Sequence, residues 1–422
     1  MGGITGLIFL TKTEVFLAEF ISLALCLSVA FKMENLPRKI LIQKFALFAG
    51  TFMIFPLLFF LYFSTHMALG QAFLSILSPW TYMANESLRA LPFFQKILGI
   101  DEATHNLTRM AFFTILFIAC FMLLFFLNHL LKDRPKQAWS FAVLVSFVIL
   151  GFASYQDFSW IELPRPLPLF MVIIFLTCNL KQRLYPSNLT FLCLTLFSFL
   201  LMLKMILNVH VYHYGFVLAL PATLVFIKAI LDELSELSSK VSGSSAFIKT
   251  VSLTLVLFYS LPHIWVSYNY YRLKTFKVGD GLDTIYTYDP SFHTRGKIVR
   301  STLEFIKENT VSDASFTAFP DSVMFNYLLR RKNPGKFTFY GPAEWILFGD
   351  NQALGSIKKD PPTYILLTQR NSEEFGYKTF GKDYGKTLYS WILKNYTQIK
   401  LIGKHPSGAT GYGIQIMKKR SL

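Results

Sequence analysis

Long apolar stretches alternate with short polar loops over the first two thirds of the chain, and a mixed sequence follows to the C-terminus. About eight of these stretches are near the length of about 20 residues that crosses a bilayer as a helix. They lie roughly at residues 15–31, 45–65, 110–131, 138–154, 167–180, 188–207, 211–231 and 246–268. The pattern predicts a polytopic α-helical membrane protein with a transmembrane domain over residues 1–269.

The last 150 or so residues alternate helical and strand-like patterns instead. Residues 297–310 and 384–396 have the amphipathic period of a helix, and 320–331 also reads as helical. Strand-like patterns occur at residues 314–320, 361–370, 398–403 and 412–419. We therefore expect residues 270–422 to form a single α/β domain, with no internal repeat.

Lys and Arg are unevenly divided between the two sets of alternate loops. One set holds Lys32, Arg38, Lys39, Lys44, Lys132, Arg134, Lys136, Lys181, Arg183, Lys228, Lys240 and Lys249. The other set holds mainly Arg89, Lys96, Arg109, Arg165 and Lys204. The richer set is expected to be cytoplasmic by the positive-inside rule, so that the connection at 66–109 and the C-terminal domain are extracytoplasmic.

The same topology places the N-terminus outside the cell, although the chain opens without a targeting segment. Residues 1–10 form an apolar run that is too short to span a bilayer and reads as the end of a longer helix. An odd number of earlier spans, missing from this sequence, would remove the difficulty. We therefore expect this sequence to be the C-terminal part of a longer protein.

Composition agrees with a membrane protein, because 53% of the residues are hydrophobic and the mean hydropathy is +0.42. The formal charge of +16 occurs without a dense Lys/Arg tract, which favours anionic lipid or lipid phosphate over nucleic acid as the partner. All four cysteines lie inside apolar stretches, without pairing or metal-ligand spacing. We expect them to be small core residues.

The connection at 66–109 mixes aromatic and charged residues, among them Trp80, Tyr82 and Arg89. Its apolar residues recur at helical spacing, which is typical of segments that lie along a membrane interface with their rings at headgroup depth. Such a segment could seat a lipid-linked substrate. A surface connector without a ligand fits these residues equally well.

Lys204, His210, His213 and Tyr214 form the strongest polar intrusion into the apolar stretches. They cluster at the extracytoplasmic ends of two adjacent predicted spans, where ionisable groups usually face a cavity or a headgroup. They are candidates for contact with a phosphate or another part of a substrate, and the alternative is that they anchor the interface. A zinc site would need further ligands at suitable spacing, so we assign no metal and no cofactor.

Asp157, Glu162 and Arg165 lie in another extracytoplasmic loop. Two carboxylates in one loop could serve in acid–base catalysis, but short polar loops have this composition by chance, and a solvated loop is the simpler interpretation. The sequence contains no P-loop, dinucleotide fingerprint, nucleophile elbow or HExxH motif.

Several segments together resemble bacterial integral-membrane glycosyltransferases of the GT-C superfamily, in particular the protein-mannosyltransferase and aminoarabinose-transferase-like group. They are GLIFLTKTEVFLA near the start, ILGIDEATHNL, HYGFVLALPA, FPDSVMFNYLLRRKNP, PPTYILLTQR and FGKDYG. The resemblance covers nearly the whole chain, but only the later spans and the extracytoplasmic domain of the family. Thr13 stands where a proline is common in the family.

The resemblance implies a protein of the bacterial inner (plasma) membrane that binds a polyprenyl-phosphate-linked sugar. The sugar would pass to a lipid or protein acceptor. The family's catalytic acidic loop follows a first span that this sequence lacks, so the catalytic residue stays unknown and a separately encoded N-terminal half is a possible partner. The alternatives are a non-catalytic lipid-binding or transport-related membrane protein, or a truncated remnant.

Overall fold

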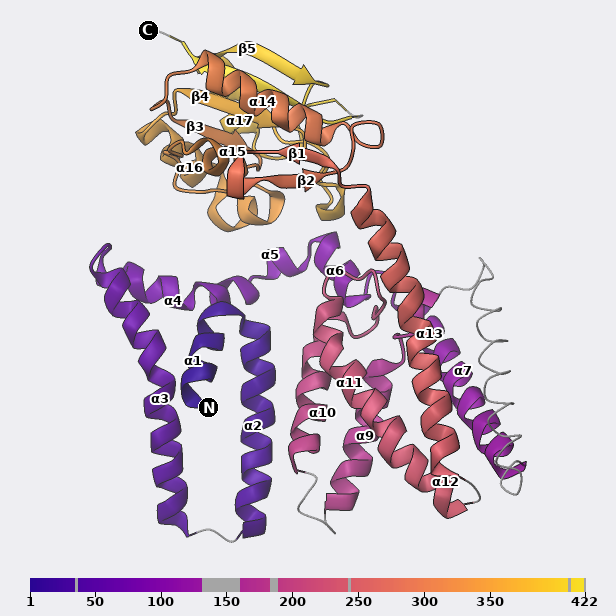
Figure 1. Cartoon of the computed structure of the whole chain (residues 1–422). Coiled ribbons are helices and arrows are strands. Elements are labelled where there is room, and N and C mark those ends of the chain that lie inside the picture. The colour runs from indigo at the N-terminus through magenta and orange to yellow at the C-terminus, as the bar shows by residue number, and fades with distance from the viewer. Residues whose placement is uncertain (35–36, 131–159, 183–188, 242–243, 409–410, 421–422) are drawn as a thin grey trace. The chain divides into compact units, whose positions relative to one another are not determined.

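The computed structural model describes the chain except for residues 35–36, 131–159, 183–188, 242–243, 409–410 and 421–422 (Figure 1). The chain divides into two compact units. Unit 1 consists of Met1–Asn85 and Phe94–Pro262, and unit 2 consists of Glu86–Phe93 and His263–Leu422. The boundary between Pro262 and His263 therefore lies inside a helix, a few residues before the boundary that the sequence predicted at 269–270.

Unit 1 consists of helices joined by loops, with no strand in its described part. Its main helices are α1 (Gly2–Thr11), α2 (Thr13–Glu34), α3 (Arg38–Ser64), α4 (Leu69–Met83), α7 (Ala103–Leu130), α9 (Leu167–Gln182), α10 (Leu189–Met202), α11 (Leu220–Ala229) and α12 (Ser235–Val241). Helices α6 (Pro92–Leu98) and α13 (Ser245–Arg272) each cross from one unit to the other. Figure 1 shows α4 lying across the ends of the neighbouring helices, whereas α2 and α3 run in opposite directions with α1 between them.

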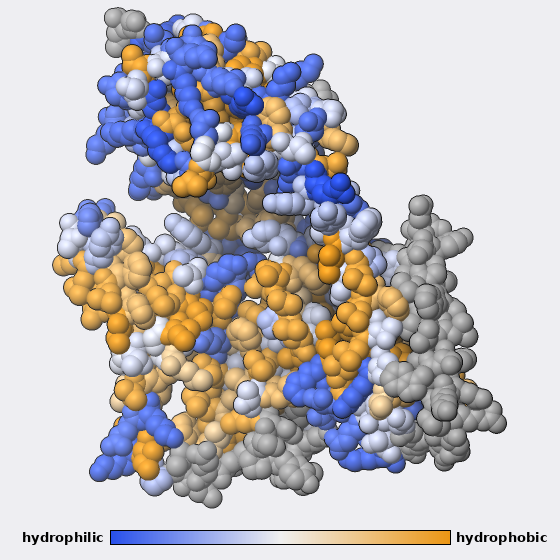
Figure 2. Space-filling model, viewed as in Figure 1, coloured by the Kyte–Doolittle hydropathy of each residue, from blue (hydrophilic) through white to orange (hydrophobic). Residues whose placement is uncertain are grey.

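Five helices in the described part of the chain are long and apolar enough to span a membrane. They cover Thr13–Phe31, Lys39–Ser64, Pro92–Leu130, Trp160–Thr177 and Ser245–Arg272. Much of the lateral surface of unit 1 is correspondingly apolar (Figure 2). The sequence thus correctly indicated a helical membrane protein, but eight spans are not established by these residues.

Three of the eight predicted spans are not among these five. The segment 138–154 lies outside the described residues. The segment at 188–207 forms a shorter apolar helix, Leu189–Met205, and the segment at 211–231 becomes regular α-helix only at Leu220. The intervening backbone forms isolated turns and also bonds to other loops, as Leu207 N–H does to Leu98 O and Val211 N–H to Ile161 O.

Helix α1 packs closely on α3 through two glycines that are four residues apart. A Cβ atom at Gly6 would lie only 2.3 Å from Phe52 O, and one at Gly2 would lie 2.4 Å from Phe48 O. Small residues at this spacing let two membrane helices approach backbone to backbone. The apolar run at the start of the chain is therefore a ten-residue helix with its own packing partner.

The described lysines of the richer loop set lie at one end of unit 1. Lys39 and Lys249 lie in the first turns of α3 and α13, Lys228 lies near the end of α11, and Lys240 lies near the end of α12. Figure 1 draws this end lowest, and hydrophilic residues gather there in Figure 2. Helices α2, α7 and α9 begin at the opposite end.

Unit 2 is built around a four-stranded sheet in the order β3 (Phe316–Phe319), β4 (Tyr364–Thr368), β6 (Gly413–Lys419), β5 (Tyr396–Gly403). β3 and β4 are parallel, and the other pairs are antiparallel. Helices α14 (Arg295–Asn309) and α15 (Met324–Leu329) cover one face, while α16 (Pro342–Lys359) and α17 (Lys386–Asn395) cover the other. A short hairpin of β1 (Phe276–Val278) and β2 (Ile285–Thr287) precedes the sheet.

Alternate residues of the strands fill the two cores, because successive side chains of a strand point to opposite faces. Leu366 packs under α14, whereas Ile365 and Leu367 pack under α16 and α17. The predicted strands and the helices at 297–310 and 384–396 are confirmed, and α15 is shorter than its predicted range. The pattern missed α16, which is interrupted by Gly349 at φ 68°.

The connection between α4 and α6 belongs to unit 2 over Glu86–Phe93, including α5 (Glu86–Arg89). Leu88 and Leu91 are buried, and the rings of Phe93 and Phe375 lie 4.7 Å apart. The predicted interfacial segment therefore consists of two parts, since α4 packs within unit 1 and the next residues pack within unit 2.

Candidate functional site

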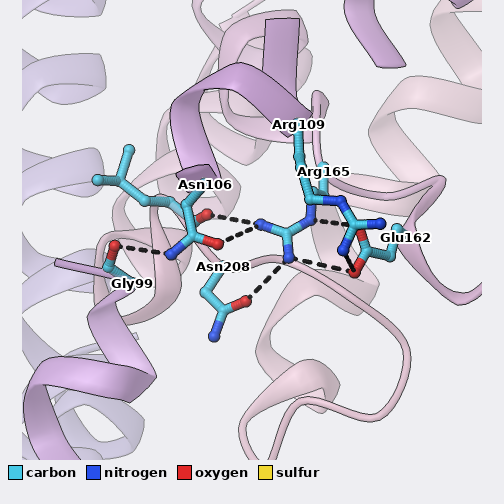
Figure 3. Close-up of polar contacts among 7 residues, drawn as sticks. Gly99, Asn106, Arg109, Glu162, Arg165 and Asn208 are labelled. Carbon is cyan, nitrogen blue, oxygen red and sulfur yellow. Dashed lines mark hydrogen bonds and ion pairs between the residues drawn. The ribbon is translucent and has the colours of Figure 1, made fainter. Parts of the chain in front are cut away.

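A buried polar network joins two loops of unit 1 and the beginning of α7 around the guanidinium group of Arg165 (Figure 3). Arg165 Nε and Nη2 donate to the two carboxylate oxygens of Glu162 at 2.9 and 3.3 Å. Arg165 Nη1 donates to Asn106 Oδ1 at 2.9 Å and to Leu207 O at 3.0 Å, and Nη2 lies 3.4 Å from Asn208 Oδ1. Four partners on three separate segments thus converge on one side chain.

Local backbone geometry places these groups. Arg165 N–H closes a turn on Glu162 O at 3.0 Å, so the two side chains three residues apart meet in the fork geometry that a carboxylate prefers. Gly99 turns the chain between α6 and α7 at φ 78°, a conformation that glycine adopts readily. Asn106 Nδ2 donates to Gly99 O at 2.9 Å and so holds that turn against the first turn of α7.

Arg109 gives the network more positive than negative charge. Its Nη1 donates to Glu162 Oε1 at 2.9 Å, so one carboxylate pairs with two guanidinium groups. The side chains of Glu162 and Arg165 are only 9% and 5% exposed, whereas that of Arg109 is 40% exposed. Arg109 can therefore hold Glu162 and still donate to an anion from its exposed side, whereas Arg165 is committed to the protein.

Lys204 lies in a second ion pair of unit 1. Its Nζ is 2.8 Å from Glu14 Oε1 at the beginning of α2, and it lies 5.8 Å from the centre of the Tyr214 ring. Both side chains of the pair are slightly more than one quarter exposed. The structure thus brings together Lys204 and Tyr214, as expected, but a phosphate at Lys204 would compete with Glu14.

His213 and His210 have different environments although their rings lie 5.7 Å apart. Both nitrogens of His213 are used, because Nε2 donates to Ile97 O at 3.0 Å and Nδ1 accepts from Gly215 N–H at 2.9 Å. Nδ1 of His210 is buried without a hydrogen-bond partner. Burial lowers the pKa of His210 to about 4, helped by the neighbouring His213 and by the positive charge of Arg165, so this ring is neutral at pH 7.

The three predicted residues of the interfacial segment are separated. Trp80 packs between the rings of Phe9 and Phe16, each 5.5 Å away, and Tyr82 is exposed on α4. Arg89 belongs to unit 2, where it lies 3.9 Å from Glu86. Their predicted role at a membrane interface stays a prediction.

The interpretation of residues 157–165 as a solvated loop is wrong for Glu162 and Arg165, which are both buried. Asp157 lies outside the described residues. Both carboxylate oxygens of Glu162 already accept hydrogen bonds from Arg109 and Arg165, so this side chain serves the network and does not face a substrate. Sequence reasoning missed Asn106 and Arg109, because only the fold brings the start of α7 next to this loop.

Among the described residues, no group of three or more His, Cys, Asp and Glu side chains could hold a metal ion. Comparisons with known protein families, curated proteins and solved structures returned no match. The described residues define a helical membrane-associated protein that carries an α/β domain.

Proposed function

We propose that this chain serves in glycosyl transfer at a membrane, with a polyprenyl-phosphate-linked sugar as donor and a lipid or protein as acceptor. The observation that supports the proposal best is the surplus of guanidinium over carboxylate in the network of Arg109, Glu162 and Arg165, at one end of a set of apolar helices. A donor of this kind combines an apolar chain with a phosphate. Such a ligand needs lipid-facing helices beside a cation that has hydrogen-bond donors to spare.

The proposed topology follows from the basic residues at the opposite end of unit 1. Lysines such as Lys39 and Lys249 would face the cytoplasm by the positive-inside rule. The network would then face the extracytoplasmic side of a bacterial inner membrane, as would the α/β domain that follows α13. Eight spans in the complete bundle belong to this proposal.

Arg109 is the residue that we assign to the lipid phosphate. When the bond between the sugar and the phosphate breaks, negative charge develops on the departing phosphate, and a guanidinium that is already fixed in place stabilises it. Arg165 and Glu162 are positioning residues in this scheme, because they hold Arg109 without facing the ligand. Lys204, His210, His213 and Tyr214 would lie further along the donor, with Lys204 exchanging Glu14 for the ligand.

Donor binding to the purified full-length chain tests this assignment. A short-chain polyprenyl-phosphate hexose should bind more tightly than the matching polyprenol, and Arg109→Gln should weaken the former by about tenfold, since hydrogen bonds to charged groups are worth about 1.5–3 kcal/mol. Lys39→Gln is the matched control, because it removes an exposed cation from the other end of unit 1. If Arg109→Gln and Lys39→Gln changed the affinity for the donor equally, and neither changed the unfolding temperature, Arg109 would not belong to the donor site.

Product analysis separates the transferase from the non-catalytic alternative. Native membranes that contain the chain should release sugar from the donor onto a lipid or protein, and membranes that contain Arg109→Gln should do so more slowly. Tight, Arg109-dependent binding without any sugar release would favour a lipid-binding or transport-related protein instead.

A further inference from the structure

The end of α13 carries the side chains that mark the surface of a membrane. Trp265, Tyr268, Tyr270 and Tyr271 are all more than half exposed within its last two turns. Arg272 lies 5.5 Å from the ring centre of Tyr268. Aromatic rings beside cations are typical of the headgroup layer at the end of a membrane-spanning helix. Because α13 is a candidate span, its last two turns, which belong to unit 2, are expected to lie in the headgroup layer.

The β1–β2 hairpin follows almost at once. Only three residues separate Arg272 from Phe276, a link that can extend by at most about 14 Å. The headgroup layer itself is about 5–8 Å thick on each side of the hydrocarbon core. The first residue of the hairpin therefore begins within about 14 Å of the end of α13.

The turn of this hairpin presents an apolar tip. Leu282 in this turn is fully exposed, and Ile285 and Tyr286 at the start of β2 are also exposed. Lys277 on the paired strand lies 5.7 Å from the ring centre of Tyr286. The tip thus repeats, on a strand turn, the combination of aliphatic, aromatic and cationic side chains found at the end of α13.

Two surface ion pairs and one hydrogen bond join the residues around Leu282 to the rest of unit 2. Asp280, two residues before Leu282, pairs with Lys307 of α14 at 2.5 Å. Asp283, directly after it, accepts from Tyr327 Oη at 2.7 Å and pairs with Arg330 at 2.5 Å. In this arrangement Leu282 projects into solvent and does not pack on the domain. A leucine held in water in this way costs free energy, which contact with lipid would recover.

We propose that the β1–β2 hairpin is a second lipid contact of this protein, separate from its membrane-spanning helices. Leu282 and Tyr286 enter the boundary between headgroups and acyl chains, and Lys277 meets lipid phosphate. The contact would hold the α/β domain against the surface of the same membrane. It requires no sugar donor and does not depend on the function proposed above.

Depth-dependent quenching in the full-length chain tests the proposal. A bimane label at Leu282→Cys, with the four native cysteines replaced by Ser, should be quenched by phospholipids that carry a nitroxide near the headgroup. The same label at Leu393→Cys is the matched control, because Leu393 is an exposed leucine of α17 on the opposite face of the sheet. Quenching should be at least twofold stronger at position 282.

Two results would overturn the proposal. Equal, weak quenching at both positions would show that the hairpin tip is in water. A blue-shifted but unquenched label at position 282 would show that the tip packs on protein instead. If the cysteine-free chain does not fold, Leu282→Trp and Leu393→Trp in the native background, with brominated lipids as quencher, make the same comparison with the same two outcomes.

Discussion

Replacing Arg165 by Met tests whether the network holds unit 1 together. The substitution keeps an unbranched side chain but removes the donors to Glu162, Asn106 and Leu207 O, and leaves Glu162 buried with Arg109 as its remaining charged partner. Removing one member of a buried ion pair typically costs about 3–5 kcal/mol, because the other charge stays desolvated. For a unit of this size that corresponds to a fall in the unfolding temperature of about 10 °C.

Thermal unfolding of the full-length chain in nanodiscs, followed by tryptophan fluorescence, measures the change. Lys228→Met is the matched control in the same unit, since Lys228 and Asp232 form an ion pair in which both side chains are about half exposed. Such surface pairs contribute about 0–1 kcal/mol. If Arg165→Met unfolded within about 1 °C of Lys228→Met, the network would not be the structural centre inferred here. If the double variant Glu162→Gln/Arg165→Met unfolded at a higher temperature than Arg165→Met, the lost stability would come from the carboxylate of Glu162 that Arg165 no longer pairs with.

Three further predictions concern other parts of unit 1. The pKa of His210 in the folded protein is about 4, below the ordinary value of 6.5. The free energy of unfolding should therefore be highest above pH 6.5 and should fall as the pH drops toward 4. His210→Leu should flatten this pH dependence of the unfolding temperature between pH 6.5 and 5. Gly6→Ala should lower the unfolding temperature, because the new Cβ would clash with Phe52 O. Gly50→Ala is the control and should raise the unfolding temperature slightly, because no atom lies within 4 Å of its Cβ and alanine favours a helix more than glycine does. Equal shifts in the two variants would contradict the close contact between α1 and α3. Cys26 of α2 is buried and Cys120 of α7 is exposed, so maleimide should label Cys120 of the folded protein and should reach Cys26 only after denaturation; labelling of Cys26 in the folded protein would contradict its burial.

Periodicity in the sequence predicted the regular elements well where burial alone decides them. β4 is buried along its whole length, and α14 buries one stripe, so both have clear patterns. It failed where the backbone departs from a regular period. The segment at 211–231 is as apolar as a span, but its first residues are bonded to other loops, and nothing in the local pattern reveals a partner such as Ile161.

The candidate site was predicted only in part for the same reason. Lys204 and Tyr214 were expected to meet, and they do, because they lie at the ends of adjacent elements. The ion pair between Lys204 and Glu14, and that between Arg109 and Glu162, join residues far apart in the chain. A charged residue beside an apolar stretch is visible in the sequence, but its counter-ion is determined by how the helices pack.

The contact between Phe93 and Phe375 has a consequence for the order of assembly. Ribosomes add about 5–20 residues per second, so the segment Glu86–Phe93 is made well before the part of unit 2 that covers it. Until then Leu88 and Leu91, which are buried in the finished protein, must remain uncovered or be held by lipid or a chaperone. A chain whose synthesis stops after α13 would therefore keep Leu88 and Leu91 without their cover from unit 2.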